Sequence, residues 1–294
     1  MQFFGRRRER AALEAAWKRA AQGQPELAVV WGRRRVGKTF LLGHVARGKR
    51  AIFFTATRQD SEERQLERFT THVREQLGGE VGDLLTAPFP SWEAALRFIA
   101  RVAADRPLLV VIDEAPRLQS ARSADFADVV SAVWENHIRD QRLLLVLSGS
   151  AVSVMERMLG PHGGLHRRAG TELRMDPFTL TDSAEFLPQL SAEELIQAYA
   201  ACGGYPLHLR RWSPDLSAAE NLAELAFTPG GLLLRDAPDI LSEDLDWRGG
   251  YERVLVAMAG GARRRSRIAS RAQQRIDYTL DRLRRAGYIN VVRP

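Results

Sequence analysis

The stretch LAVVWGRRRVGKT, residues 27–39, constrains the fold more than any other part of the chain. It begins as a short apolar run, turns at Gly32, and continues after Gly37 into the helix-favouring stretch KTFLLGHVARG. Residues 32–39 match G-x-x-x-x-G-K-[ST] without deviation, and the strand and helix predicted on either side are the context that this motif requires. With glycine at about 7% of residues, chance alone would give the pattern in roughly one chain in a hundred. The sequence therefore predicts a strand, a phosphate-binding loop and a helix.

Every position of this loop has an expected role toward a nucleotide. The glycines let backbone N–H groups turn inward, and the helix N-terminus adds about half a positive charge at the same place. The expected contributors are Gly32, Arg33, Arg34, Arg35, Val36, Gly37, Lys38, Thr39 and Phe40. Lys38 should reach the β- and γ-phosphates of ATP, and the Thr39 hydroxyl should bind Mg²⁺. The three arginine side chains occupy variable positions and are expected to point away from the nucleotide, toward water or a neighbouring subunit.

Two adjacent carboxylates close the apolar run LLVVIDE, residues 108–114. Asp113, at the end of the predicted strand, would approach Mg²⁺ from the side opposite Thr39. Glu114 can polarise the attacking water as a general base. A helix cap is the alternative role for Asp113, but an acid pair on a buried run beside a phosphate loop favours the catalytic interpretation.

The next apolar run, LLLVLSG at residues 143–149, ends in serines. In a parallel sheet its carboxyl end faces the same crevice as the other strands. Ser148 or Ser150 could therefore hydrogen-bond the γ-phosphate or the water. The alternative is that Ser-Gly-Ser only forms a turn.

Apolar runs and helical patterns alternate through the first 180 residues. Strands are predicted at 27–32, 51–56, 108–113 and 143–149, with an alternating edge strand at 172–178. Helices are predicted at 61–77, 91–104 and 123–138, with Ser61 and Ser91 as N-caps. Continuous apolar strands separated by helices predict a parallel sheet with helices on both faces, an α/β fold.

After Pro177 the pattern becomes helical. Over the whole chain, four segments are expected. Residues 1–178 would form the α/β domain, 179–235 a helical lid domain, 236–250 a linker, and 251–294 a winged helix-turn-helix domain. In the last segment a helix, a second helix, a longer helix from about Arg271 and a short final strand are predicted. Its expected core is Val254, Leu255, Met258, Ile268, Ile276, Leu280 and Leu283.

Composition excludes several classes of protein. The chain has 294 residues, 45% hydrophobic and 27% charged, which is typical of a soluble globular protein. No stretch approaches the roughly 18 apolar residues of a membrane span, and the start lacks the apolar run of a secretory signal. The single cysteine, Cys202, excludes an internal disulfide and a cysteine-built zinc site. We therefore expect a cytoplasmic protein without membrane contact.

The net charge of +7 is concentrated at one end of the chain. Residues 251–294 hold eleven arginines against three carboxylates, so the first 250 residues are close to neutral. Such asymmetry predicts an acidic partner, here double-stranded DNA, with a helix in the major groove and arginines on phosphates. A basic but merely solvated surface is the alternative.

The ordered motifs resemble the archaeal and bacterial P-loop ATPases of the STAND branch of AAA+-like proteins, related in design to origin-recognition ATPases. FFGRRRERAAL is similar to that family's first box, GRRRVGKT and VVIDEAPRL to its Walker motifs, and LSGSAVSVM to its sensor segment. ACGGYPLHL resembles its G-G-x-P motif, and the basic end its winged helix. The resemblance spans nearly the whole chain.

The resemblance implies further site residues. Phe4, Gly5 and Arg6 would lie against the nucleotide base, with Glu9 in the same box, although Arg6 and Glu9 could also form only an ion pair at a helix start. Pro206 would pack on the base, or Gly203–Pro206 could be a simple helix stop.

The resemblance also implies an arginine finger, supplied by the same or a neighbouring subunit of a homo-oligomer. Arg168 matches the finger position best, although Arg167 stands where the family usually has glycine. Many relatives continue past the winged helix, whereas this chain stops at INVVRP. It is therefore either a short member or one whose C-terminal module is absent.

Two functions fit the sequence. The first is an ATPase that converts ATP to ADP through Mg²⁺, changes conformation and acts on or with DNA, with weak turnover until an oligomer or DNA completes the site. The second is a switch held by its nucleotide, with very slow hydrolysis and a winged helix that contacts protein. A small-molecule kinase is disfavoured, because Glu114 suits the activation of water better than transfer to a substrate.

Overall fold

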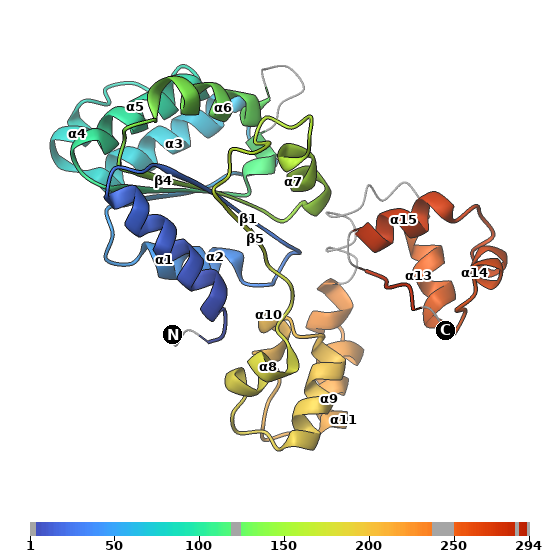
Figure 1. Ribbon diagram of the computed structural model, residues 1–294. Helices are drawn as coiled ribbons and strands as arrows, with labels where there is room; N and C mark the ends of the chain where they lie inside the picture. The colour runs from blue at the N-terminus through green and yellow to red at the C-terminus, as the bar shows by residue number, and fades with distance from the viewer. Residues whose placement is uncertain (1–3, 119–124, 237–249, 286–287, 293–294) are drawn as a thin grey trace. The chain divides into compact units, whose positions relative to one another are not determined.

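The computed structural model describes residues 4–118, 125–236, 250–285 and 288–292 (Figure 1). The chain divides into two compact units, residues 1–218 and 219–294. Most of the predicted linker, 237–249, lies outside the described residues. The boundary between the units falls inside the segment predicted as a helical lid, so the predicted domain limits stay a prediction.

A five-stranded parallel sheet forms the centre of the first unit. Its order is β2-β3-β4-β1-β5. The strands are β1 (Glu26–Trp31), β2 (Ala51–Thr55), β3 (Leu108–Asp113), β4 (Leu143–Gly149) and β5 (Thr171–Arg174). The four predicted buried strands are confirmed within two residues. β5 is at the sheet edge, as predicted, although it is shorter than expected.

Both faces of the sheet are covered, and every residue of the central strands β3 and β4 is buried. Along β3, Leu108, Val110 and Ile112 contribute to one hydrophobic cluster, while Leu109 and Val111 contribute to the other. The first cluster packs under α3 (Glu62–Leu77), α5 (Trp92–Asp105) and α6 (Phe126–His137). The second packs under α1 (Arg7–Ala21) and α2 (Lys38–Ala46) on the opposite face (Figure 1).

The two predicted helix starts are confirmed. The Ser61 side chain accepts a hydrogen bond from the backbone N–H of Arg64 at 3.3 Å, and the Ser91 side chain accepts one from that of Ala94 at 3.1 Å. Each serine satisfies an N–H group that the first helical turn leaves without an intrahelical partner.

The remaining helices of the first unit occur in the connections between strands or follow β5 in the chain. They are α4 (Gly79–Asp83), the 3₁₀ turn η1 (Ala115–Leu118), α7 (Val152–Leu159), α8 (Leu180–Phe186), α9 (Ala192–Cys202) and α10 (Pro206–Leu209). α8, α9 and α10 contact one another and form a small helical group after β5.

Helices are the regular structure of the second unit in its described residues, and turns and loops connect them. α11 (Ala218–Leu222) begins at the unit boundary and is followed by η2 (Ala223–Phe227), α13 (Tyr251–Ala259), α14 (Arg265–Ala272) and α15 (Asp277–Arg285). α13, α14 and α15 enclose a core that contains five of the seven residues predicted for it, and the other two, Leu255 and Met258, are partly buried and pack against it.

Two expectations for the C-terminal segment are wrong. The last helix begins at Asp277, not near Arg271, because Gln273 adopts a left-handed conformation (φ 51°) that ends α14. The predicted final strand is absent from residues 288–292. In the described part of the chain, no helix combines the length and apolar character needed to cross a bilayer.

Candidate functional site

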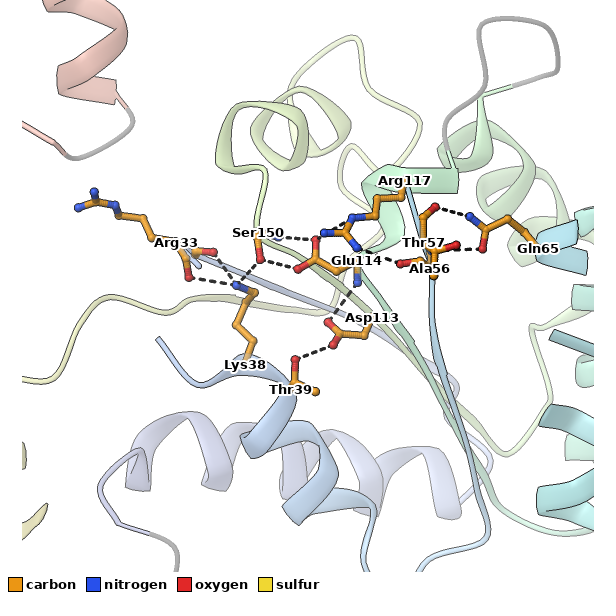
Figure 2. A network of polar contacts seen from close by, with 11 residues as sticks. Arg33, Lys38, Thr39, Ala56, Thr57, Gln65, Asp113, Glu114, Arg117 and Ser150 are labelled. Carbon is orange, nitrogen blue, oxygen red and sulfur yellow. Dashed lines mark hydrogen bonds and ion pairs between the residues drawn. The ribbon is translucent and has the colours of Figure 1, made fainter. Parts of the chain in front are cut away.

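Three strand ends and one helix start bring the predicted site residues together (Figure 2). β4 pairs with β1 on one side and with β3 on the other. The loop after β1 and the acid pair after β3 are therefore separated by one strand, whose carboxyl end continues into Ser150. This order explains why Ser150 lies between the phosphate-loop lysine and the carboxylates.

The Lys38 side chain folds back onto the phosphate loop and hydrogen-bonds the start of that loop. Lys38 is buried, and its Nζ donates to the carbonyl oxygens of Gly32 at 2.8 Å and Arg33 at 3.1 Å, and to Ser150 Oγ at 3.0 Å. A side chain at position 32 would clash, because a Cβ there would lie 2.1 Å from the Met175 carbonyl oxygen. The glycine permits this close approach of the loop to the strand β5 segment.

Thr39 and Asp113, the two residues expected to bind Mg²⁺, contact each other. Thr39 Oγ1 donates to Asp113 Oδ2 at 2.6 Å, and the Asp113 side chain is almost fully buried. Asp113 Oδ1 also accepts from the Glu114 backbone N–H at 3.1 Å, so both carboxylate oxygens have partners. Two hard oxygen donors side by side at the start of α2 are suited to a magnesium ion that is also bound by phosphates.

Glu114 is held in an unusual conformation. Its φ is 56°, in the left-handed region that residues with a side chain seldom adopt. Its Oε1 accepts a 2.5 Å hydrogen bond from Ser150 Oγ, and its Oε2 accepts a 3.3 Å bond from the Ser150 backbone N–H. Left-handed backbone at a non-glycine residue persists where the surroundings impose it, and such residues concentrate at functional sites.

The two serines of LSGSAV have different environments. Ser148 is fully buried within β4, and among the described residues its Oγ has no hydrogen-bond partner. Ser150 lines the cleft and contacts both Lys38 and Glu114. Ser148 is not among the residues that line the cleft, so its assignment to the nucleotide stays a prediction.

A cleft of about 950 Å³ lies between the strand ends and α8 and α10. Its polar wall includes Thr55, Lys38, Thr39, Asp113, Glu114, Arg117 and Ser150. Its apolar wall includes Phe4, Phe40, Phe178, Phe186, Leu207 and Pro206. A volume in the range of small-molecule sites, with polar groups at one end and aromatic rings at the other, fits a ligand that has a charged part and a flat apolar part.

Arg6 connects the first box to the phosphate loop. The Arg6 side chain is mostly buried and donates to the carbonyl oxygens of Val36 at 3.0 Å and Asp176 at 2.5 Å. It also pairs with Glu9 at 3.0 Å and lies over the Phe178 ring, 4.8 Å from its centroid. The ion pair considered from sequence is thus present, together with contacts that fix the loop.

The other two residues of the first box differ in their contacts with the cleft. Phe4 lies edge-on to Phe186, with ring centroids 5.5 Å apart, and lines the cleft. Gly5, with φ 60°, does not line the cleft but places a would-be Cβ 3.3 Å from the Phe178 ring.

The G-G-x-P segment is both a helix stop and part of the cleft wall. Gly203 ends α9 in the left-handed conformation, and Gly204 receives a hydrogen bond from the Phe178 N–H at 2.8 Å. A Cβ on Gly204 would lie 2.2 Å from the Phe178 carbonyl oxygen. Pro206 is the first residue of α10 and lines the cleft, and its packing on the base stays a prediction.

Two of the three loop arginines, Arg34 and Arg35, are among the residues that line the cleft. Whether their side chains point away from a nucleotide stays a prediction. Arg35 has φ 68°, in the left-handed region. The Arg33 guanidinium lies 5.7 Å from the centroid of the Tyr205 ring.

The candidate finger arginine is not part of this cleft. Arg168 pairs with Glu135 of α6 at 2.5 Å and is absent from the cleft wall. Its neighbour Arg167 has φ 56°. Within one chain, therefore, Arg168 does not join Lys38 and Glu114.

Two arginines of the cleft wall were not predicted from the sequence. Arg117 follows Glu114 by three positions, and Arg210 follows Pro206 by four. Their spacing from motif residues was the available signal, since Arg117 lies in η1 and Arg210 directly follows α10. No group of three or more histidine, cysteine or acidic side chains suited to a metal occurs among the described residues.

Comparisons with known proteins identify the family of the chain and its fold. The sequence model of a family described as an ATPase domain predominantly from Archaea matches residues 3–211. The uncharacterised protein MJECL04 of Methanocaldococcus jannaschii is 25% identical over 187 residues, which are 63% of this chain. The match spans 39% of that relative's length.

Solved structures share the fold at low sequence identity. The Walker-type ATPase PABY2304 of Pyrococcus abyssi superposes with a TM-score of 0.69 and 17% identity, over 98% of this chain and 91% of that one. The ORC2 protein of Aeropyrum pernix, solved as ADPNP–ADP complexes, gives 0.64 and 16%, over 98% and 88%. The ORC1 protein of the same organism, in complex with DNA, gives 0.54 and 16%, over 97% and 84%. The chain therefore belongs to the family of ATPase domains that come predominantly from Archaea, and it shares the fold of these solved structures.

Proposed function

We propose that the chain binds ATP with Mg²⁺ in the 950 Å³ cleft and hydrolyses it to ADP and phosphate. One observation carries the proposal. Ser150 is hydrogen-bonded to both Lys38 and Glu114, and Thr39 is bonded to Asp113, so the phosphate loop and the acid pair meet in one place (Figure 2). Separate structural roles for these residues would not require them to converge.

The polar wall would hold the phosphates and the metal. Lys38 Nζ lies among three oxygen acceptors, so a more strongly charged acceptor such as a phosphate can replace them. Thr39 and Asp113 offer a hydroxyl and a carboxylate to Mg²⁺, which typically takes one or two protein oxygens beside substrate phosphates and water. The ion would neutralise charge on the β- and γ-phosphates.

The chemistry would be an in-line displacement at the γ-phosphorus. A water oxygen forms the new bond to phosphorus while Glu114 accepts one of its protons, and the bond to the bridging oxygen breaks to leave ADP and phosphate. Lys38 would stabilise the negative charge that develops on the oxygens. Glu114 lies next to Asp113 in the chain, so base and metal ligand share one strand end.

The aromatic end of the cleft would hold the base. Phe4 and Phe186 stand edge to face, and Pro206 lines the same cleft, which supports packing against a flat heterocycle. Arg6 would couple base binding to the loop, because it donates to the Val36 carbonyl oxygen.

Three variants test the assignment of hydrolysis. Glu114→Gln should abolish steady-state turnover while nucleotide affinity is kept, and Lys38→Ala should lose binding of a fluorescent ATP analogue. Ser217→Ala, outside the cleft, is the matched control. Turnover that persists in Glu114→Gln would remove this carboxylate from the mechanism.

Assembly would complete the site. Arginine fingers raise rates about 10³- to 10⁵-fold, and Arg168 is paired with Glu135 on its own chain rather than facing Lys38. We therefore infer that the finger acts on a neighbouring subunit. Specific activity should rise with protein concentration in the wild type and stay flat in Arg168→Ala.

The second unit supports a DNA contact. α14 and α15 are joined by a four-residue turn and packed on α13, and their arginines 263, 264, 265, 267, 271, 275, 284 and 285 are exposed. This helix-turn-helix arrangement with a basic exterior would contact duplex DNA. Affinity for a duplex should fall steeply with salt, and a flat salt response would contradict phosphate contacts.

A nucleotide-held switch is the second candidate. The position of Arg168 outside its own cleft favours it, because a chain without a finger hydrolyses slowly. Steady-state ATPase measured with and without duplex DNA separates the two functions. Tight nucleotide binding with negligible turnover in every condition would support the switch, whose winged helix would then contact protein. The motif-based assignment to the STAND branch stays a prediction.

A further inference from the structure

Arg117 is held next to Glu114 by the backbone of η1. The Arg117 N–H donates to the Glu114 carbonyl oxygen at 2.9 Å, which closes a tight turn directly after the strand β3. Pro116, inside the same turn, packs against the end of β4, where a Cβ on Gly149 would lie 2.7 Å from its ring. The turn therefore has little freedom to move relative to the sheet, and the backbone of Arg117 is held in place.

The Arg117 side chain reaches two elements of the site (Figure 2). Its Nε lies 3.9 Å from Glu114 Oε2, and its Nη1 donates to the Ala56 carbonyl oxygen at 3.3 Å. The side chain lines the cleft and is 28% exposed, so most of its surface is covered by protein. Neither contact belongs to the phosphate loop, the metal pair or the predicted finger.

The segment that anchors Arg117 is itself rigid. Ala56 donates its N–H to the Asp113 carbonyl oxygen at 2.9 Å. The Gln65 side chain, which is almost completely buried, bonds both backbone groups of Thr57, accepting at 3.3 Å and donating at 2.6 Å. The far end of the guanidinium is thus fixed to a segment that α3 holds in place.

We propose that Arg117 is a positioning residue for the Glu114 carboxylate, an inference that rests on the proposed hydrolysis of ATP. Ser150 from β4 and Arg117 from η1 approach the carboxylate from different elements, and together they set the direction in which it accepts a proton. A base must hold its lone pair toward the water within a fraction of an ångström, and a misplacement of about 1 Å can cost a factor of 10² in rate. The backbone of Glu114 is itself in the left-handed region, with φ 56°, a conformation that concentrates at functional sites.

A purely structural role makes a different prediction. An ion pair at 3.9 Å with partly exposed partners contributes little to stability, so its loss would leave both binding and turnover almost unchanged. If Arg117 instead only maintained the fold of the cleft, nucleotide affinity and turnover would fall together. If Arg117 positions Glu114, its loss should lower kcat and leave the nucleotide affinity unchanged.

The experiment measures kcat and the dissociation constant of the ATP analogue ADPNP separately in the full chain. Arg117→Ala should lower kcat by about 10- to 100-fold with the dissociation constant within twofold of the wild type. Arg117→Lys should recover part of the loss, and added guanidinium ion should recover part of it in Arg117→Ala but not in Glu114→Gln. Arg97→Ala is the charge control, because Arg97 is an exposed arginine of α5 paired with Glu93 at 3.7 Å.

The outcomes separate this inference from the proposed function. If the wild type turns over, Glu114→Gln is inactive and Arg117→Ala keeps its kcat, the positioning role is overturned while the ATPase function stands. A parallel loss of affinity and kcat in Arg117→Ala, without rescue by guanidinium, also overturns it. A wild type inactive with and without DNA, at every concentration, overturns the hydrolysis and the positioning role together.

Discussion

Thr39 Oγ1 donates a 2.6 Å hydrogen bond to Asp113 Oδ2, although 74 positions separate the two residues in the chain. Thr39 stands in the first turn of α2, and Asp113 is the last residue of β3. Parallel strands bring their carboxyl ends to one edge of the sheet, so the register of the sheet determines this contact. The pair supplies the two protein oxygens expected for Mg²⁺.

Thr39→Ala should weaken ATP binding only when Mg²⁺ is present. Loss of one charge-assisted contact corresponds to about tenfold in the dissociation constant, or roughly 1.4 kcal/mol. Isothermal titration with ATP, in magnesium and then in EDTA, measures the effect. Thr39→Ser keeps the hydroxyl and should bind as the wild type does. An equal loss of affinity in EDTA would show that Thr39 acts on the fold of the loop and not on the metal.

The two serines at the end of β4 should respond in opposite ways. Ser150→Ala removes a hydroxyl that contacts Lys38 and Glu114, so kcat should fall by about 10- to 100-fold. Ser148→Ala removes a buried hydroxyl without a hydrogen-bond partner in the described structure, so stability should stay the same or rise. Thermal unfolding and steady-state turnover of both variants provide the comparison. Comparable kcat values in the two variants would contradict the assignment of Ser150.

Much of the site could be predicted because its residues lie next to structural boundaries. Gly32, Asp113 and Glu114 stand where an apolar run stops, Lys38 begins the helix after the glycine loop, and strands buried on both faces are readily identified from such runs. The alternation of strands and helices then predicts that these boundaries meet at one sheet edge. Local sequence pattern therefore determines the polar half of the cleft.

The parts that sequence reasoning missed depend on long-range packing. Whether Ser148 or Ser150 enters the cleft is decided by where β4 ends, a boundary that a serine-glycine-serine pattern does not reveal. Arg117 reaches Ala56 only because β2 and β3 are neighbours, and sequence spacing carries no information about that pairing. The start of α15 depends on a left-handed Gln273, a conformation for which glutamine has no strong preference.

Gly204→Ala should destabilise the first unit strongly. Its φ is 73°, and an added Cβ would meet the Phe178 carbonyl oxygen at 2.2 Å, so strain and steric overlap add to about 3 kcal/mol or more. Gly48→Ala is the matched control, because Gly48 also has positive φ, at 70°, but nothing lies within 4 Å of its would-be Cβ. Calorimetry should show a larger fall in melting temperature for the first variant. Equal shifts would mean that backbone strain, not the contact with Phe178, limits position 204.

Cys202 should report on the opening of the α9–α10 region. Burial raises the pKa of its thiol from 9.0 to about 12, so at pH 8 only about one thiol in ten thousand is ionised in the folded chain. Because the thiolate is the reactive form, iodoacetamide should modify the native protein slowly and the unfolded protein quickly. ATP with Mg²⁺ should slow the native reaction further, since Pro206, four residues later, lines the cleft. As this is the chain's single cysteine, mass spectrometry of the whole protein gives the rate directly. The contrary result is a rate of modification in the wild type that is the same with and without nucleotide and equal to that of Lys38→Ala. That result would show that nucleotide binding does not affect the G-G-Y-P segment.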